Sequence, residues 1–339
     1  MTNPSAVDHR EPGRFQNRAG SPDQSKRFTP NRTKKLHLHP NDQAVVHLVD
    51  RCRFLDSRQL RLTIGRGLNP RAFLRRLQQL FHAEYLDRPQ QQLNRWWTKG
   101  EATKHFVYGL GIEGHKLLYP ELHRKGAPTT DWRLRNRRAG AVYMDHRLAL
   151  SEVMLSFVGA AEGINAQVVN WTEGKEFHQA TRLPDYVQLE TRTGTVDVPL
   201  NPDAHFVLAA SDGRREHFFL EVDRGTEPIM RTTWRRTHVY RKLAGYWQLY
   251  RGRLAERVGI PSFRVLTVTT SATRIDNMRA LARAMDPKQK GSALFLFTTL
   301  DQITLDNPGP SLTAPIWFSP VEHADVRALL AAAEAEPHA

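Results

Sequence analysis

The chain has 339 residues, with 49 Lys and Arg against 35 Asp and Glu, which gives a formal net charge of +14. This excess points to a polyanionic partner, although it does not distinguish DNA from RNA or anionic lipid. The single cysteine, Cys52, excludes an intrachain disulfide and a thiolate zinc cluster. No apolar run approaches a transmembrane helix, and the N-terminus lacks an apolar signal core, so we expect a bacterial cytoplasmic protein with no membrane partner.

Residues 1–40 are predicted to form a disordered basic tail. They are rich in Pro, Asn, Gln, Ser and Arg and contain almost no apolar side chains. Basic residues outnumber acidic ones, so the tail is either an electrostatic tether for nucleic acid or a solubilising extension.

Residues 41–122 are predicted to form a winged helix-turn-helix domain. Apolar side chains at helical spacing indicate three helices, and Asn69-Pro70 marks the start of the third. Extended runs at 85–88 and 104–110 follow, which gives the element order of a winged helix.

In such a domain the third helix enters the major groove of DNA, and the loop at 90–99 would be the wing. The basic residues predicted to contact DNA there are Arg71, Arg75, Arg76, Arg95 and Lys99. Two alternatives stay open: the third helix has an ordinary solvated face, or the domain binds only protein.

Residues 123–140 are predicted to be a basic linker. The segment contains the turn-forming run 126–130 and the cluster Arg133, Arg135, Arg137 and Arg138. It is either a solvated connector or a clamp for the DNA backbone between the two domains.

Residues 141–339 are predicted to form an α/β domain. A helix over 146–163 carries Glu152 in its middle, a candidate site carboxylate or a plain surface residue. A strand over 166–171 and irregular or short strands over 181–198 precede a hairpin and a helix over 231–253. The apolar strands 263–269 and 293–298 are typical of a sheet covered on both faces, and helices are expected at 272–285 and 321–336.

The predicted hairpin places acidic side chains at one end of the sheet. Its strands, 198–210 and 217–222, are separated by the turn-forming run 211–214. Asp203 lies near the start of the first strand, and Glu221 and Asp223 lie at the end of the second, where residues i and i+2 share a face. Three converging carboxylates favour Mg²⁺ or Mn²⁺, unless these residues merely flank solvated strand ends.

Lys242 and Tyr246 lie four residues apart on the next helix and therefore share a face. A hairpin with Asp and Glu, followed by a helix with a polar residue and Tyr at this spacing, resembles the PD-(D/E)xK nuclease superfamily. The nearest branch is the RecB-like one, in which Gln stands where this chain has Lys242. The longer string Pro202-Asp203, Glu221-Val222-Asp223-Arg224-Gly225-Thr226-Glu227, Lys242 and Tyr246 is similar to the replication-relaxation family of bacterial plasmids and mobile elements.

This resemblance implies a fold with an N-terminal winged helix and a restriction-endonuclease-like mixed sheet. It assigns Asp203 and Glu221 to a metal ion and the position of Asp223 to a catalytic lysine, so this chain departs from the pattern there. Either Lys242 fills the gap, or Asp223 binds a second metal, or Arg224 and Arg231 stabilise the scissile phosphate; otherwise catalysis has been lost. The candidate catalytic residues are Asp203, Glu221, Asp223, Lys242 and Tyr246, the candidate metal ligands are Asp203, Glu221 and Asp223, and Arg224 is a candidate DNA contact.

The function that follows from the resemblance is the handling of double-stranded plasmid or mobile-element DNA at an origin. The protein would nick or cleave this DNA with Mg²⁺ (or Mn²⁺), and a homodimer is one assembly left open. The alternative is a non-catalytic winged-helix regulator with a degenerate nuclease-like domain.

Overall fold

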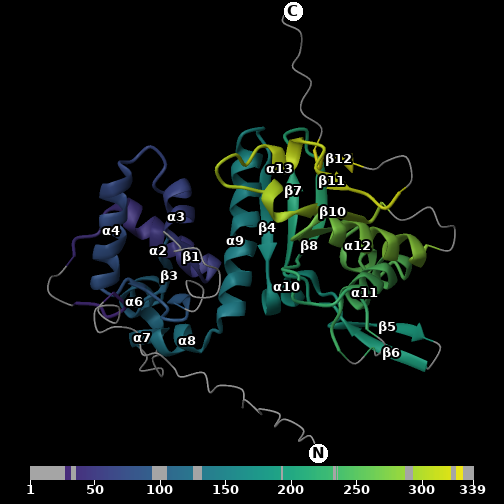
Figure 1. The fold of residues 1–339 in the computed structure, drawn as a ribbon, viewed down its shortest axis with the longest axis horizontal. Coiled ribbons are helices and arrows are strands. Elements are labelled where there is room, and N and C mark those ends of the chain that lie inside the picture. The colour runs from purple at the N-terminus through teal and green to yellow at the C-terminus, as the bar shows by residue number, and fades with distance from the viewer. Residues whose placement is uncertain are drawn as a thin grey trace, which may run out of the picture.

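The computed structural model describes residues 27–31, 36–93, 105–124, 132–191, 194–231, 234, 236–286, 293–321 and 326–330. Over these residues the chain is mixed α/β, with a three-stranded sheet in its N-terminal part and a seven-stranded mixed sheet in the remainder (Figure 1). The predicted α/β class is confirmed at this level.

The N-terminal unit, which we define as the described residues up to 138, is built from helices around a small antiparallel sheet. Strand β3 lies between β1 and β2 and pairs antiparallel with both. Its elements are α2 (Pro40–Cys52), β1 (Leu55–Asp56), α3 (Ser57–Thr63), α4 (Pro70–His82), β2 (Leu86–Asp87), β3 (Val107–Leu110), α6 (Ile112–Leu118), α7 (Pro120–Arg124) and α8 (Trp132–Arg138).

The first three helices form where the apolar spacing predicts them. The Asn69 side chain accepts a hydrogen bond from the Ala72 amide at 3.1 Å and caps α4, as Asn before a helix commonly does. Strand β1 was not predicted. It is only two residues long, and its Asp56 also caps α3 by accepting from the Gln59 backbone N–H at 2.8 Å. Two residues are too few to show the alternation of apolar and polar side chains that predicts a strand.

Two predicted connecting segments are partly ordered. Within the predicted tail, Phe28 is buried and contacts Phe106 edge-on. Within the predicted linker, residues 132–138 form α8, where Trp132 is buried and the Asn136 amide donates to Asp87 at 2.9 Å. These contacts attach both segments to the rest of the N-terminal unit, near its small sheet. Residues 1–26 and 32–35 of the predicted tail and residues 125–131 of the predicted linker lie outside the described residues.

The larger sheet has helices on both faces. Long helix α9 covers one face, and α11 and α12 cover the other (Figure 1). The elements are α9 (Ala141–Glu162), β4 (Gln167–Thr172), α10 (Gly174–Thr181), β5 (Tyr186–Thr191), β6 (Gly194–Pro199), β7 (Ala204–Ala209), β8 (Arg215–Val222), α11 (Val239–Arg251), the 3₁₀ turn Glu256–Val258, β9 (Phe263–Thr269), α12 (Ala272–Met285), β10 (Phe295–Thr299), the 3₁₀ turn Leu300–Gln302, α13 (Pro310–Thr313), β11 (Trp317–Phe318) and β12 (Val326–Arg327).

Among the described residues the strand order of this sheet is β12-β11-β10-β9-β8-β7-β4. Strands β8, β9 and β10 are parallel, whereas β4, β7 and β8 are antiparallel neighbours, as are β10, β11 and β12. The predicted hairpin is therefore β7–β8. Its first strand begins at Ala204, because Val198 and Pro199 belong to β6 of a separate hairpin.

The β5–β6 hairpin packs against α11 beside the larger sheet (Figure 1). A Cβ atom at Gly245 of α11 would lie 2.9 Å from a Val198 methyl carbon. Glycine at this position therefore allows the hairpin to approach the helix closely.

Two predicted helices differ from the structure. Helix α11 begins at Val239 instead of residue 231, because the His238 ring caps it through the Arg241 amide at 3.1 Å. The predicted helix over 321–336 is wrong at Val326 and Arg327, which form β12 and pair with β11. Strand pairing at the sheet edge here overrides the helix propensity of an Ala-rich sequence. Residues 331–339 lie outside the described residues.

Helix α9 joins the two parts of the chain through Glu152. The Glu152 carboxylate accepts hydrogen bonds from the Arg58 guanidinium at 3.0 Å, from the side-chain amide of Gln59 at 2.9 Å and from the backbone N–H of Leu305 at 3.0 Å. Glu152 therefore stabilises the contact between the N-terminal unit and the larger sheet, and it is not the additional site carboxylate that the sequence allowed.

Replacing Glu152 with Ala should lower the free energy of unfolding by about 2 kcal/mol or more, because the change leaves buried donors and a charge without their acceptor. Chemical denaturation measures this decrease. The control is Glu162→Ala at the exposed end of the same helix, which should change stability by about 0.5 kcal/mol or less. Equal effects of the two changes would contradict this role for Glu152.

Candidate active site at the ends of β7 and β8

Two carboxylates lie on neighbouring strands where β7 begins and β8 ends. The Asp203 amide donates to the Leu220 carbonyl at 3.0 Å, and its carboxylate accepts from the Val222 amide at 2.7 Å. Because Ala204 pairs with Leu220, Asp203 lies across from Glu221. Directly opposite residues of antiparallel strands project to the same face, so both side chains start from one face of the sheet.

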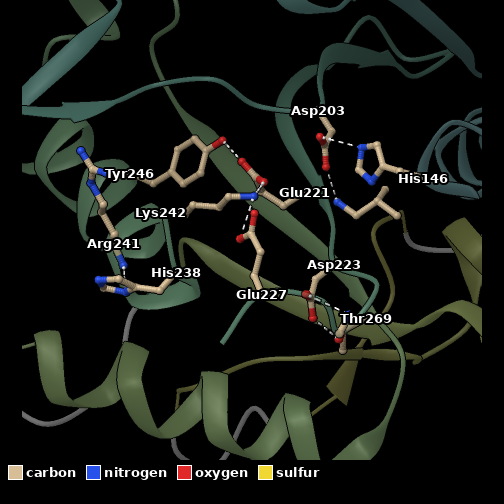
Figure 2. A network of polar contacts seen from close by, with 12 residues as sticks. His146, Asp203, Glu221, Asp223, Glu227, His238, Arg241, Lys242, Tyr246 and Thr269 are labelled. Carbon is tan, nitrogen blue, oxygen red and sulfur yellow. Dashed lines mark hydrogen bonds and ion pairs between the residues drawn. The ribbon is translucent and has the colours of Figure 1, made fainter. Parts of the chain in front are cut away.

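Glu221 is 6% exposed and is held by two side chains of α11. The Lys242 ammonium lies 3.1 Å from one Glu221 oxygen, and the Tyr246 hydroxyl donates to the other at 2.5 Å. Lys242 also lies 3.3 Å from Glu227. Figure 2 shows Lys242 between these two acidic side chains. The i, i+4 spacing thus brings both predicted helix residues to Glu221.

His146 completes the contacts of Asp203, although the sequence pattern did not indicate it. Its Nε2 lies 3.0 Å from an Asp203 oxygen, and the ring comes from α9 on the other side of the strand ends (Figure 2). No local motif marks this residue. The available signal was its place on the helix that precedes the sheet, six residues before Glu152.

Asp223 is oriented differently from the other two acids. Arg274 of α12 donates to both of its oxygens, at 2.7 and 2.9 Å, and Thr269 donates at 2.6 Å. Arg274 also donates to the Glu227 carbonyl at 2.9 Å. Asp223 is therefore committed to fixing the turn after β8. Asp223 is half of an ion pair with Arg274, whereas Asp203 contacts His146 and Glu221 contacts Lys242.

Arg224 is likewise engaged within the chain. Its guanidinium binds Asp145 at 2.9 Å and the Val142 carbonyl at 3.2 Å. These contacts tie the end of β8 to the start of α9.

A cavity of about 540 Å³ opens on these side chains. It extends from the start of α9 to the turn after β8, so ligand-sized space adjoins Asp203 and Lys242. Its polar and charged lining residues are Tyr143, His146, Asp203, Asp223, Arg224, Thr226, Glu227 and Lys242. A second cavity, of about 270 Å³, reaches Glu221, Lys242 and Tyr246 from the side of the β5–β6 hairpin.

Burial and charge separate the pKa values of the two acids. Burial raises the pKa of Glu221 to about 7, with Asp203 adding to the effect and Lys242 opposing it. Burial acts in the same sense on Asp203, but the hydrogen bond and charge of His146, with help from Lys242, hold the pKa of Asp203 below its ordinary value. Of the two acids, Asp203 therefore has the lower pKa and Glu221 the higher one.

Lys242 and Tyr246 of α11 remain protonated. The negative charge of Glu221 raises the pKa of Lys242 despite its desolvation, and burial followed by Glu221 raises the pKa of Tyr246. Both the Lys242 ammonium and the Tyr246 phenol donate hydrogen bonds, and the ammonium also carries a positive charge. Lys242 in this arrangement orients and balances charge and does not accept a proton.

The two carboxylates suit a divalent ion that keeps much of its water. Among the described residues, no three His, Cys, Asp or Glu side chains lie together as a metal site. Mg²⁺, however, is commonly bound through one or two carboxylates, with water and substrate phosphates supplying its other ligands. Such an ion would use Asp203, which lines the larger cavity, and Glu221, which lines the smaller one. Asp223 also lines the larger cavity, but it is paired with Arg274.

The residues predicted to contact DNA fall into three groups. Arg71 and Arg75 are exposed on α4. Arg76 lies on the same helix but pairs with buried Asp42 at 2.6 Å and donates to the His37 carbonyl at 2.5 Å, so it stabilises the N-terminal unit. Arg95 and Lys99 lie outside the described residues.

The fold and the site define a basic, mixed α/β protein with two carboxylates beside a helix-borne lysine and tyrosine. The model of the replication-relaxation family matches residues 46–261, and the chain belongs to that family. No curated protein and no solved structure matches the chain. None of the helices that the structure describes has the length and apolar character of a membrane-spanning segment.

The raised pKa of Glu221 predicts a pH-dependent stability. Its pKa moves from 4.5 to about 7 on folding, so the folded state binds the proton more tightly. This stabilisation is complete below about pH 4.5 and disappears as the pH rises through about 7. Replacing Glu221 with Gln removes the carboxyl group that titrates.

The free energy of unfolding of the wild type relative to Glu221→Gln should therefore fall by about 3 kcal/mol between pH 4 and pH 8. Denaturant unfolding without divalent ions at several pH values measures it. A difference that stays constant across this range would show that Glu221 keeps an ordinary pKa in the folded protein.

Proposed function

We propose that this protein binds double-stranded DNA of a plasmid or mobile element during replication and nicks or cleaves it with Mg²⁺. The observation that carries the proposal is the placement of Lys242 and Tyr246 on Glu221, with Asp203 across the hairpin. Membership of the replication-relaxation family supports the role in replication and the interaction with DNA.

The N-terminal unit supports the DNA-binding part of this proposal. We interpret it as a winged helix, because helix, strand, two helices and two strands follow one another and β3 lies between β1 and β2. Helix α4 is then the recognition helix. Arg71 and Arg75 are exposed on it and are suited to phosphates or guanine edges.

The larger domain supports the nuclease part. We interpret it as a PD-(D/E)xK-like domain, because α9, β4, the β7–β8 hairpin, α11 and β9 follow one another around a mixed sheet. The candidate residues lie at the end of the hairpin and on the helix after it, where the resemblance implies them.

In the proposed mechanism Asp203 and Glu221 would hold Mg²⁺, which lowers the pKa of a bound water and acts as a Lewis acid toward the phosphate. To act as a ligand, Glu221 would give up its proton to solvent. Lys242 and Tyr246 fix the orientation of the Glu221 carboxylate through both oxygens. His146 fixes Asp203 from the other side. The protonated Lys242, which lines the larger cavity, supplies positive charge toward a bound phosphate.

A second candidate is a DNA-binding regulator without catalytic activity. One observation favours it: the position at which the superfamily has a lysine is Asp223, and this side chain is consumed by an ion pair with Arg274. In this case the larger domain is a scaffold, and the protein binds DNA without cutting it.

Incubation with supercoiled plasmid separates the two candidates. The wild type should produce relaxed or linear DNA with Mg²⁺ and none with a chelator. Glu221→Gln should lower the rate by about 100-fold or more, since even groups that only orient metal ligands contribute about 10- to 100-fold, while gel-shift affinity is retained.

The matched control is Glu216→Gln on the same strand, which removes a carboxylate paired with Arg264 and should leave cutting unchanged. Absence of any relaxed or linear product from the wild type at every Mg²⁺ and Mn²⁺ concentration, with DNA binding intact, would favour the regulator.

The exposed arginines of α4 give a further prediction. Arg71→Ala combined with Arg75→Ala should weaken DNA binding and reduce the slope of log affinity against log salt by about 0.9 for each phosphate that the protein no longer neutralises. Fluorescence anisotropy with a labelled duplex measures the slope. Arg251→Ala combined with Arg257→Ala, which removes the same charge from exposed positions on and after α11, is the control. An unchanged slope in the α4 variant would place the DNA-binding surface elsewhere.

A further inference from the structure

A group of arginines lies where the N-terminal unit meets the larger domain. Arg53, which ends α2, has its guanidinium 5.1 Å from the centre of the Trp132 ring and 4.9 Å from that of Phe54. Arg135 of α8 lies 4.4 Å from the same Trp132 ring. We call Arg53, Trp132 and Arg135 the junction cluster. Trp132 is buried and holds the two cations near one another.

Asp50 offsets only part of the unfavourable electrostatic environment of Arg53. Nη1 of Arg53 is buried and has no hydrogen-bond partner among the described residues. Burial, together with the charges of Arg135 and Arg147, lowers the pKa of Arg53 to about 10. A partly buried cation among like charges is costly, and binding an anion would relieve that cost.

The backbone at Arg53 is also unusual. Its φ of 70° and ψ of −46° lie in a region that a residue with a side chain rarely adopts. Such conformations persist where the surroundings enforce them, and they cluster at functional positions. This geometry directs the Arg53 side chain back over Phe54 and toward Trp132.

The junction cluster adjoins the cavity of the candidate active site. The ring centres of Phe54, beneath Arg53, and Tyr143 lie 6.5 Å apart, and Tyr143 lines the cavity with His146 and Asp203. Helix α8, which carries Arg135 and exposed Arg138, lies at the foot of α9 (Figure 1). A nucleic-acid backbone that enters the cavity past Tyr143 would therefore run over these arginines.

We propose that the junction cluster binds the DNA sugar–phosphate backbone beside the nucleotide in the active-site cavity. This inference rests on the proposed function and adds a binding surface that lies outside both α4 and the acidic site. Arginine suits the position because a planar guanidinium stacks on an aromatic ring and still has N–H groups to donate to a phosphate. Arg135, which is exposed, lies over the Trp132 ring in this way. The cluster would connect recognition by the N-terminal unit to the cavity of the larger domain.

The test is anisotropy of a fluorescently labelled duplex between about 50 and 300 mM NaCl, a range over which phosphate contacts dominate the salt dependence. The proteins are the full-length wild type, Arg135→Ala, Arg53→Gln with Arg135→Ala, and the control Arg251→Ala with Arg257→Ala. The double junction variant should reduce the salt slope by about two units, and Arg135→Ala by about one. The control should keep the wild-type slope.

A further variant that combines the junction and α4 substitutions should show the sum of the two slope reductions, because the two surfaces are separate. Thermal unfolding checks each variant, and Arg135→Ala, at an exposed position, gives the result if Arg53→Gln fails to fold. Wild-type slopes in folded junction variants, or reductions equal to those of the control, would overturn the role of the junction cluster. A wild type without affinity for DNA would instead overturn the proposed function itself.

Discussion

The buried carboxylate of Glu221 is the constraint around which the candidate site is arranged. A carboxylate removed from water must be paired or protonated, and here Lys242 and Tyr246 supply one donor to each oxygen. The pairing fixes α11 against the end of β8. It also keeps Lys242 charged, so the site presents an ammonium beside two acids instead of a free base.

A second set of interactions brings the site to the edge of the N-terminal unit. Helix α9 supplies His146 to Asp203 and binds the N-terminal unit through Glu152. Arg224 fastens the end of β8 to Asp145 of the same helix. One rigid helix thus positions a site residue and the unit proposed to bind DNA, and the junction cluster lies where the two meet. DNA recognition and chemistry on DNA would therefore occur on one continuous surface.

Much of the site followed from local sequence pattern. The hairpin placed Asp203 opposite Glu221, and the i, i+4 spacing placed Lys242 and Tyr246 together, because strand and helix periodicities are strict. Contacts distant in sequence were not predictable. Arg274 lies 51 residues from Asp223, His146 lies 57 residues from Asp203, and Asp42 lies 34 residues from Arg76. Each of these partners is chosen by tertiary packing. Arg274 and Asp42 hold Asp223 and Arg76 in ion pairs, whereas His146 adds a contact to Asp203.

Asp203 and Glu221 are proposed to hold one divalent ion next to Lys242. Titration with Mn²⁺ followed by electron paramagnetic resonance measures this binding without DNA and without turnover. One site is expected in the wild type, and it should be absent from both Asp203→Asn and Glu221→Gln. Binding that is unchanged in both variants, or absent from the wild type, would contradict this proposal.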